Sequence, residues 1–260
     1  MKNEKIKKCA IIFAGGKFSC KEKTLPLLNK ILKNFTNSGN NSNNSNNFCN
    51  ENIVLIAADS GLVCADNYGL NCQYFLGDMD SVPDNLKKKY SDLPTFTFPK
   101  DKDFSDTELA FFKAEELKSE IFILLGGSGG RMDHFLSLFA LFAQKTYPFF
   151  WFTEENIFIC LDSDKNREIF VNGLSENDAV SVFAIIVPPF YKNCQNTKPV
   201  CKSKNLVWQL DNLEWDKGFY SLSNRIKNEK DALQLSALCG RFVLVLPLKE
   251  ELDFFKLPSI

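Results

Sequence analysis

Histidine is almost absent from this chain, which has one histidine, His134, in 260 residues. A catalytic triad built on histidine is therefore not expected. Long apolar runs are also missing, because none reaches the roughly 18 residues that a membrane-spanning helix needs. The first eight residues lead straight into a short predicted strand and not into the apolar region of a signal peptide. We therefore expect a cytoplasmic protein that has no membrane partner.

The chain also lacks a large net charge of either sign and a C-x-x-C cysteine motif. The formal net charge is −1, and no stripe of Lys and Arg interrupts the acidic segments, which argues against nucleic acid as a partner. Nine cysteines are scattered along the chain without a C-x-x-C pair. Neither a disulfide framework nor a zinc site is indicated, and we expect reduced, mostly buried thiols.

A polar tract of low complexity covers residues 34–50 and consists largely of Asn and Ser. Such a composition offers almost no apolar surface to offset the entropy lost on ordering. We expect a disordered insertion on the surface.

Strands and helices alternate in the remainder of residues 1–155. The predicted strands are 9–13, 53–57, 72–76, 95–98 and 121–125. The predicted helices are 25–33, 62–68, 84–90, 107–117 and 132–144. Continuous apolar strands separated by helices predict a mainly parallel α/β sheet covered on both faces.

Short strands with turn signals replace this alternation in residues 156–260. The predicted strands are 157–161, 168–171, 179–187, 206–210, 218–222, 232–236 and 242–246. This pattern predicts a second, all-β domain, a β-sandwich or a small barrel.

Acidic or glycine-rich segments follow several strands of the first domain. They are Ala-Ala-Asp-Ser-Gly (57–61), Gly-Asp-Met-Asp-Ser (77–81), Asp-Lys-Asp-Phe-Ser-Asp-Thr-Glu (101–108) and Gly-Gly-Ser-Gly-Gly-Arg-Met-Asp-His (126–134). They contribute the carboxylates of Asp59, Asp78, Asp80, Asp106 and Asp133. Because the carboxyl ends of parallel strands face one crevice, these side chains can converge. Two carboxylates about 4 Å apart repel by roughly 4 kcal/mol, so the cluster favours a cation. Hard oxygen ligands favour Mg²⁺, and the glycine-rich turns suggest a nucleoside triphosphate.

Two carboxylates in this set are spaced to share one metal. Asp78 and Asp80 lie at i and i+2, on the same side of an extended strand end. A turn that caps the next helix is the alternative. Lys102 is a candidate for pairing a phosphate oxygen as a point charge, and an exposed lysine in a charged loop is its alternative.

Glycine turns at two strand ends are candidates for contact with phosphate. Gly127, Gly129 and Gly130 allow backbone N–H groups to approach an anion closely. Arg131 can clamp phosphate with its planar fork, and Asp133 can orient that arginine or reach the metal. A plain turn with a surface arginine is the alternative. Gly15 and Gly16, after the first predicted strand, also indicate a turn that faces the nucleotide, although two glycines alone are weaker evidence.

The order of these motifs resembles the thiamine pyrophosphokinase family. The resemblance runs from about residue 9 to residue 246 and includes Leu-Val-Trp-Gln-Leu (206–210) and Ser-Leu-Ser-Asn (221–224). It implies an α/β domain that binds ATP and Mg²⁺, a β domain that helps to bind thiamine, and a homodimer with sites between subunits. It also implies that Asp106 is a third metal ligand, for which a helix cap is the alternative. The thiamine contacts that it implies are Trp208, Ser221, Ser223 and Asn224, and a core position is the alternative for Trp208.

The expected activity is transfer of a pyrophosphoryl group from ATP to the hydroxyl of thiamine, with AMP as the second product. Magnesium on Asp78, Asp80 and Asp106 would bind the triphosphate, with Asp59 and the glycine turns as further nucleotide contacts. Two alternatives stay open. One is a pyrophosphokinase for another hydroxymethyl heterocycle such as a pterin. The other is a non-catalytic regulator that binds thiamine diphosphate.

Overall fold

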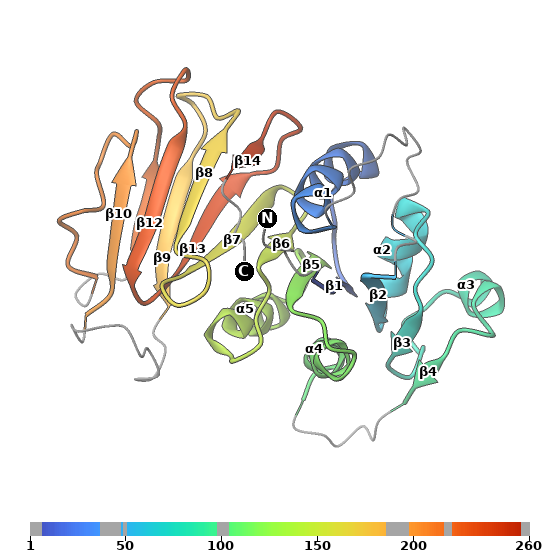
Figure 1. Ribbon diagram of the computed structural model, residues 1–260. Helices are drawn as coiled ribbons and strands as arrows, with labels where there is room; N and C mark the ends of the chain where they lie inside the picture. The colour runs from blue at the N-terminus through green and yellow to red at the C-terminus, as the bar shows by residue number, and fades with distance from the viewer. Residues whose placement is uncertain are drawn as a thin grey trace, which may run out of the picture. The chain divides into compact units, whose positions relative to one another are not determined.

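The computed structural model describes residues 7–36, 48, 51–97, 104–185, 198–215 and 220–255. The chain divides into two compact units. Unit 1 comprises residues 1–141 and 146–154, and unit 2 comprises residues 142–145 and 155–260. Figure 1 labels most of the helices and strands of the two units.

Strands and helices alternate along unit 1. Its strands are β1 (Cys9–Ala14), β2 (Ile53–Ala58), β3 (Tyr74–Leu76), β4 (Thr95–Phe96), β5 (Ile121–Gly126) and β6 (Phe150–Phe152). Its helices are α1 (Lys21–Thr36), α2 (Gly61–Tyr68), α3 (Asp84–Lys89), α4 (Asp106–Glu116) and α5 (Met132–Ala140). A 3₁₀ turn, η1 (Leu141–Ala143), follows α5 directly.

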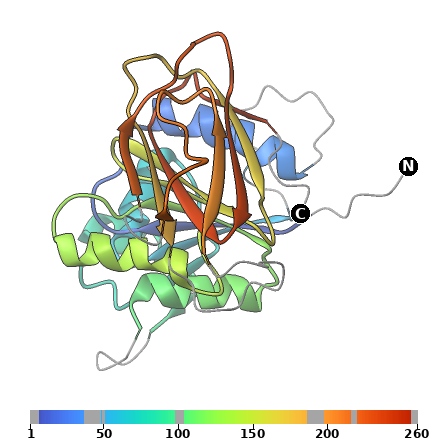
Figure 2. The ribbon, with the colours of Figure 1, turned by 90° about the vertical axis from the view of Figure 1, so that its left-hand side faces the viewer.

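The sheet of unit 1 has the order β6-β5-β1-β2-β3-β4, and each of these neighbouring pairs is parallel. Strands β1, β2 and β5 are buried along their whole length, as their continuous apolar sequences predict. Helix α1 lies on one face of this sheet, and α4 and α5 lie on the other (Figures 1 and 2). The mainly parallel α/β sheet expected from the sequence is therefore present.

Helix α1 differs from the prediction at both ends. It begins at Lys21, four residues before the predicted start, and contains Pro26. It runs through Thr36 and so includes the first residues of the polar tract. Phe48, inside the same tract, is buried, which corrects the expectation that the tract has almost nothing to bury. Residues 37–47, on which most of the disorder prediction rests, lie outside the described residues.

Unit 2 consists of antiparallel strands. They are β7 (Asn156–Asp162), β8 (Glu168–Asn172), β9 (Val180–Ile185), β10 (Val200–Lys204), β11 (Tyr220–Asn224), β12 (Leu233–Cys239), β13 (Arg241–Pro247) and β14 (Asp253–Phe255). They form two sets, ordered β11-β9-β13-β7 and β10-β12-β8-β14. Buried and partly exposed residues alternate along β9 and β12, as expected where one face of a strand meets a core.

The predicted strand at residues 206–210 is wrong. Leu206 makes only an isolated bridge with Ile226, and the following residues form an irregular loop. Strand β10 precedes this segment and was not predicted, because Val-Cys-Lys-Ser-Lys carries two exposed lysines. Strand β14 was missed because it has three residues.

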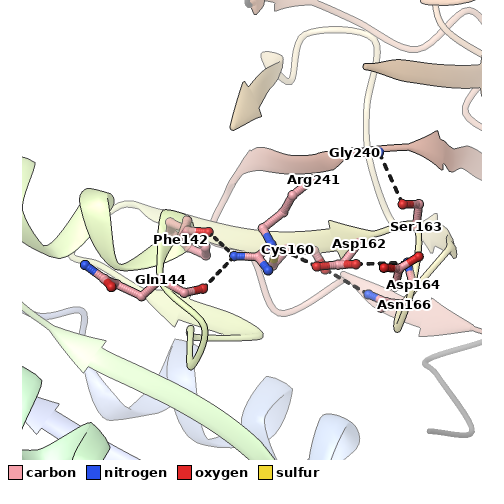
Figure 3. A network of polar contacts seen from close by, with 9 residues as sticks. All are labelled: Phe142, Gln144, Cys160, Asp162, Ser163, Asp164, Asn166, Gly240 and Arg241. Carbon is pink, nitrogen blue, oxygen red and sulfur yellow. Dashed lines mark hydrogen bonds and ion pairs between the residues drawn. The ribbon is translucent and has the colours of Figure 1, made fainter. Parts of the chain in front are cut away.

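A buried ion pair organises the polar part of the core of unit 2 (Figure 3). The Nε of Arg241 donates to Asp162 Oδ2 at 2.8 Å, and both side chains are less than one tenth exposed. Arg241 Nη1 also donates to the carbonyls of Phe142 (2.6 Å) and Gln144 (2.8 Å). Asp162 Oδ1 accepts from the Asp164 N–H at 2.9 Å. Partners on both sides offset the cost of removing the two charges from water.

The cysteines are mostly buried thiols, as expected. The free cysteines that the structure describes are Cys9, Cys20, Cys64, Cys72, Cys160 and Cys201, of which only Cys20 is exposed. Burial raises the pKa of Cys9, Cys72 and Cys160 far above the ordinary range of a thiol, so these groups are not thiolate nucleophiles. Cys239 departs from the expectation because it is disulfide-bonded.

Within the described ranges, none of the helices combines the length and the apolar character that crossing a membrane requires.

Candidate active site

The order of strands in unit 1 places two glycine-containing turns side by side. The chain moves from β1 outward through β2, β3 and β4 and then returns to β5 on the other side of β1. The carboxyl ends of β1 and β5 therefore mark the point where the strand order reverses, which is where ligands bind in open α/β sheets. The turn at Gly15 and Gly16 follows β1, and the turn that begins at Gly127 follows β5.

Backbone hydrogen bonds tie these two turns together. The Lys17 N–H donates to the Ser128 carbonyl at 2.5 Å, and the Ser128 N–H donates to the Lys17 carbonyl at 3.2 Å. A Cβ on Gly16 would lie 2.9 Å from the Ser128 carbonyl oxygen, and the φ of Gly16 is +109°. Only glycine combines a readily accessible positive φ with the absence of a Cβ, so the close approach of the two turns explains why residue 16 is a glycine.

The turn after β5 is built from glycines in the left-handed region. Gly127, Gly129 and Gly130 have φ values of +80°, +70° and +72°. A Cβ on Gly127 would strike Leu138 of α5 at 2.2 Å, so this glycine permits helix and turn to pack. A Cβ on Gly130 would meet no atom within 4 Å, so the backbone there faces open space. That side of Gly130 therefore has room for an approaching anion.

Arg131 and Asp133 form an exposed pair at the start of α5. Arg131 Nε donates to Asp133 Oδ1 at 3.1 Å, and Nη2 donates to Oδ2 at 2.5 Å. The arginine hydrogen bond lowers the pKa of Asp133 to about 2. Their side chains are 71% and 62% exposed. The carboxylate orients the guanidinium while leaving it accessible to a ligand.

Asp59 links the turns after β2 and β3. It follows β2 with a φ of +51°, and its N–H donates to the Leu76 carbonyl at 2.8 Å. Ser81 Oγ donates a short hydrogen bond to Asp59 Oδ1. A Cβ on Gly77 would come within 3.4 Å of the Asp59 backbone. The structure therefore brings together the segments 57–61 and 77–81, and Ser81 is a contact that the sequence analysis missed.

Asp78 and Asp80 lie on the tight turn after β3. Both are exposed, and the Asp80 N–H donates to Asp78 Oδ1 at 3.0 Å. Met79 between them has a φ of +60°. The turn is thus more sharply bent than the extended strand end that we expected, and a local hydrogen bond replaces the simple i, i+2 geometry.

Asp106 is the first residue of α4 and does not cap it. Ser105 is the N-cap, and its Oγ accepts from the Glu108 N–H at 3.2 Å. The Glu108 carboxylate accepts from the Ser105 N–H at 2.8 Å, which completes a capping box. The alternative in which Asp106 caps a helix beginning at Thr107 is therefore wrong. A carboxylate in the first turn is still favoured by the helix dipole.

The described residues contain no group of three or more His, Cys, Asp or Glu side chains that could hold a metal ion by themselves. Magnesium does not need such a group, since it is commonly held by one or two carboxylates together with substrate phosphates and water. Two exposed carboxylates, those of Asp78 and Asp80, lie on one turn. Their hard oxygen donors fit that mode of binding.

Lys102 and His134 are the two remaining candidates from the sequence. Lys102 lies outside the described residues, so its predicted contact with phosphate is not tested. His134 is exposed on α5, and its carbonyl accepts from Ser137 Oγ at 2.8 Å within the helix.

In unit 2 the loop that follows β10 presents Trp208 to solvent. The indole is 56% exposed, so Trp208 is not part of the core of its unit. Asn224, at the end of β11, is 1% exposed and fixes the loop from beneath. Its Nδ2 donates to the Trp208 carbonyl at 2.7 Å, and its Oδ1 accepts from the N–H groups of Trp208 (3.2 Å) and Arg225 (2.9 Å). Asn224 therefore positions Trp208 through the backbone.

The other predicted thiamine contacts lie beside this asparagine on β11. Ser221 Oγ accepts from Asn224 Nδ2 at 3.4 Å, and the Ser223 N–H donates to Ser181 Oγ at 3.2 Å. Ser223 is exposed and has a φ of +52°. Arg225, which the sequence analysis did not single out, places its guanidinium carbon 5.6 Å from the centre of the Trp208 ring. Arg225 directly follows the Ser-Leu-Ser-Asn segment, and this position in the sequence could have marked it as a candidate.

Residues 45–149 match the family model for the catalytic domain of thiamin pyrophosphokinase. This segment contains the acidic turns after β2 and β3, the start of α4 and the glycine turn after β5. No curated protein matches the chain in sequence.

Solved thiamin pyrophosphokinases share the fold of the chain. The enzyme from Bacillus subtilis is 18% identical with a TM-score of 0.60, over 92% of this chain and 99% of that one. The enzyme from Candida albicans is 13% identical with a TM-score of 0.57, over 94% and 90% of the two chains. At such identities the likeness concerns the fold alone, whereas the catalytic-domain match is a match in sequence. By that match, residues 45–149 resemble the catalytic domain of the thiamin pyrophosphokinase family.

Proposed function

We propose that this protein transfers the pyrophosphoryl group of ATP to the hydroxyl of thiamine, giving thiamine diphosphate and AMP. The observation that carries the proposal is the catalytic-domain match over residues 45–149. That segment contains the carboxylates and the glycine turn at the carboxyl edge of the parallel sheet. We further propose a cytoplasmic homodimer in which unit 2 forms a β-sandwich that contributes to thiamine binding.

The carboxyl edge of unit 1 would hold Mg-ATP. Asp78 and Asp80, with Asp106 as a third candidate, would hold magnesium, and a bound magnesium ion would neutralise charge on the triphosphate. Asp59 would hold the turn after β3 in place through Ser81. The turn Gly127–Gly130 would offer backbone N–H groups to phosphate oxygens, and the Arg131 guanidinium, oriented by Asp133, would stabilise charge that develops there.

The β11 edge of unit 2 would hold thiamine. An exposed indole fixed by its backbone suits an aromatic heterocycle, because the platform loses little conformational entropy on binding. Trp208 would be this platform, while Ser221 and Ser223 would provide hydroxyls for hydrogen bonding. Since the polar atoms of Asn224 already bond to the backbone, we propose a positioning role for Asn224 instead of direct contact.

The reaction breaks the bond between the α,β-bridging oxygen of ATP and the β-phosphorus, and it forms a bond from the thiamine hydroxyl oxygen to that phosphorus. The hydroxyl proton leaves to a base, for which the carboxylates of the same edge are candidates. AMP departs with the bridging oxygen. The γ-phosphate of ATP then becomes the terminal phosphate of thiamine diphosphate.

The test is an assay of the purified full chain with ATP, Mg²⁺ and thiamine. We expect AMP and thiamine diphosphate in a one-to-one ratio, and label on the γ-phosphate should end on the vitamin. Thiamine monophosphate with ADP would overturn pyrophosphoryl transfer. A panel of hydroxymethyl heterocycles that includes a pterin checks the acceptor, and tight binding of thiamine diphosphate without turnover would favour a regulator.

A further inference from the structure

Lys17 lies at the point where the two glycine turns of unit 1 meet. It follows Gly15 and Gly16 at the end of β1, and its backbone pairs in both directions with Ser128. Ser128 Oγ also donates to the Lys17 carbonyl at 2.9 Å. The position of Lys17 beyond the carboxyl ends of β1 and β5 is therefore fixed by the main chain and does not depend on its side chain.

The side chain of Lys17 runs along the glycine turn. A Cβ added to Gly129 would lie 2.6 Å from Lys17 Cδ and 2.8 Å from Cγ. Gly129 thus leaves room for the lysine stem to pass over the turn. The stem is held against the turn whose backbone faces open space at Gly130.

The ammonium group at the end of this stem has a partner that can be exchanged. Lys17 Nζ lies 3.4 Å from Glu154 Oε2, and the side chains are 64% and 43% exposed. An exposed ion pair at this distance adds little to stability and yields readily to a stronger partner. The Glu154 N–H donates to Ser128 Oγ at 2.9 Å, so the backbone that carries this carboxylate is anchored to the same turn.

We propose that Lys17 is a further triphosphate-binding residue and that Glu154 holds its ammonium group in place until a nucleotide binds. The proposal rests on the proposed function, because it assigns Lys17 to the same ATP site. The chain lacks the phosphate-loop motif that ends in Lys-Ser or Lys-Thr. Lys17 would place an equivalent point charge beside a glycine turn from a different strand.

Opposite effects of the two members of the pair test this inference. Lys17→Met keeps an unbranched stem against Gly129 and removes the charge, so we expect affinity for Mg-ATP to fall by about 10-fold or more. Glu154→Gln removes a carboxylate that competes for the ammonium and repels phosphate, so affinity should rise by roughly 2- to 5-fold. Calorimetry with Mg-ATP in the absence of thiamine measures both changes, and melting temperatures check that the variants are folded.

A comparison of the affinities for ATP, ADP and AMP tests whether Lys17 contacts the outer phosphates. The loss in Lys17→Met should be largest for ATP, smaller for ADP and negligible for AMP, and Lys17→Arg should recover part of the affinity. Unchanged ATP affinity in a folded Lys17→Met variant, or a loss of the same sign in both variants, would overturn the inference. These outcomes are separable from failure of the proposed function. Normal thiamine diphosphate synthesis by Lys17→Met would overturn the role of Lys17 alone, whereas a wild-type chain that binds ATP through Lys17 but forms no thiamine diphosphate would overturn the function alone.

Discussion

The two Arg–Asp pairs of this protein have the same chemistry and opposite surroundings. Arg241 and Asp162 are 7% and 3% exposed and come from strands far apart in the sequence, whereas Arg131 and Asp133 are 71% and 62% exposed and lie two residues apart. The buried guanidinium has two further carbonyl partners in unit 2 (Figure 3). The exposed guanidinium donates to the Asp133 carboxylate and is open to solvent.

Burial decides what each pair can do. A buried pair is expensive to form and more expensive to break, because removal of one partner leaves a charge without compensation. An exposed pair is screened by water and salt and contributes little to folding, so its arginine can exchange partners at small cost. The Arg241–Asp162 pair therefore belongs to the fold, and the Arg131–Asp133 pair is available for binding an anion.

The largest effect is expected from breaking the buried pair. Asp162→Ala should lower the free energy of unfolding by about 3–5 kcal/mol, because the Arg241 charge stays buried without its carboxylate. Urea denaturation measures the change. The matched variant Asp133→Ala should unfold within experimental scatter of the wild type. Equal destabilisation by the two variants would contradict the contrast between the pairs.

Exposed carboxylates at the strand ends should affect turnover and not stability. Asp80→Asn should lower kcat by about 100-fold, comparable to the loss of one preorganised electrostatic group. Asp84→Asn is the control, since Asp84 is exposed on the neighbouring helix α3, where it pairs with Lys87. Steady-state kinetics and urea denaturation of both variants give the comparison. Near-normal turnover in folded Asp80→Asn would remove this residue from the site.

The tryptophans of unit 2 offer the same contrast between exposed and buried positions. Trp208→Ala should weaken thiamine binding by about 1–3 kcal/mol, the usual worth of stacking a heterocycle on an aromatic side chain. Affinity for ATP and the melting temperature should change little. Trp215, which is buried against Phe242, is the counterpart, and Trp215→Ala should cost stability. Calorimetric titration with each substrate measures the two affinities. Equal losses of affinity for thiamine and for ATP in Trp208→Ala would place the indole outside the thiamine site.

The smallest effect concerns the pH dependence of the exposed pair. The pKa of Asp133 is about 2 in the folded chain, below its unfolded value of about 3.9. A depressed pKa means that any stabilisation by the carboxylate is complete above about pH 4 and is lost as the pH falls through 2. The Asp133 carboxyl carbon should titrate in an NMR experiment with a midpoint near 2 in the wild type and nearer 3.9 in Arg131→Met. A midpoint near 3.9 in the wild type would show that the pair does not persist in solution.

The sequence by itself determined the parallel core of unit 1 and the resemblance to the thiamin pyrophosphokinase family. Apolar runs between turn signals predicted β1, β2 and β5 to within one or two residues, because a strand buried on both faces is apolar throughout. The order of the acidic and glycine-rich segments carried the family resemblance. Those features are local along the chain, so a linear pattern contains them.

Only the tertiary structure decided which distant residues meet. Hydrogen bonds join Ser128 to Lys17, 111 residues away, and Arg241 to Asp162, 79 residues away. Residues 206–210 have the composition of a strand, yet the side chain of Asn224 satisfies the backbone of Trp208 and holds the segment as a loop. Such contacts depend on the register and packing of strands that are far apart in the sequence, so no local pattern of residues encodes them.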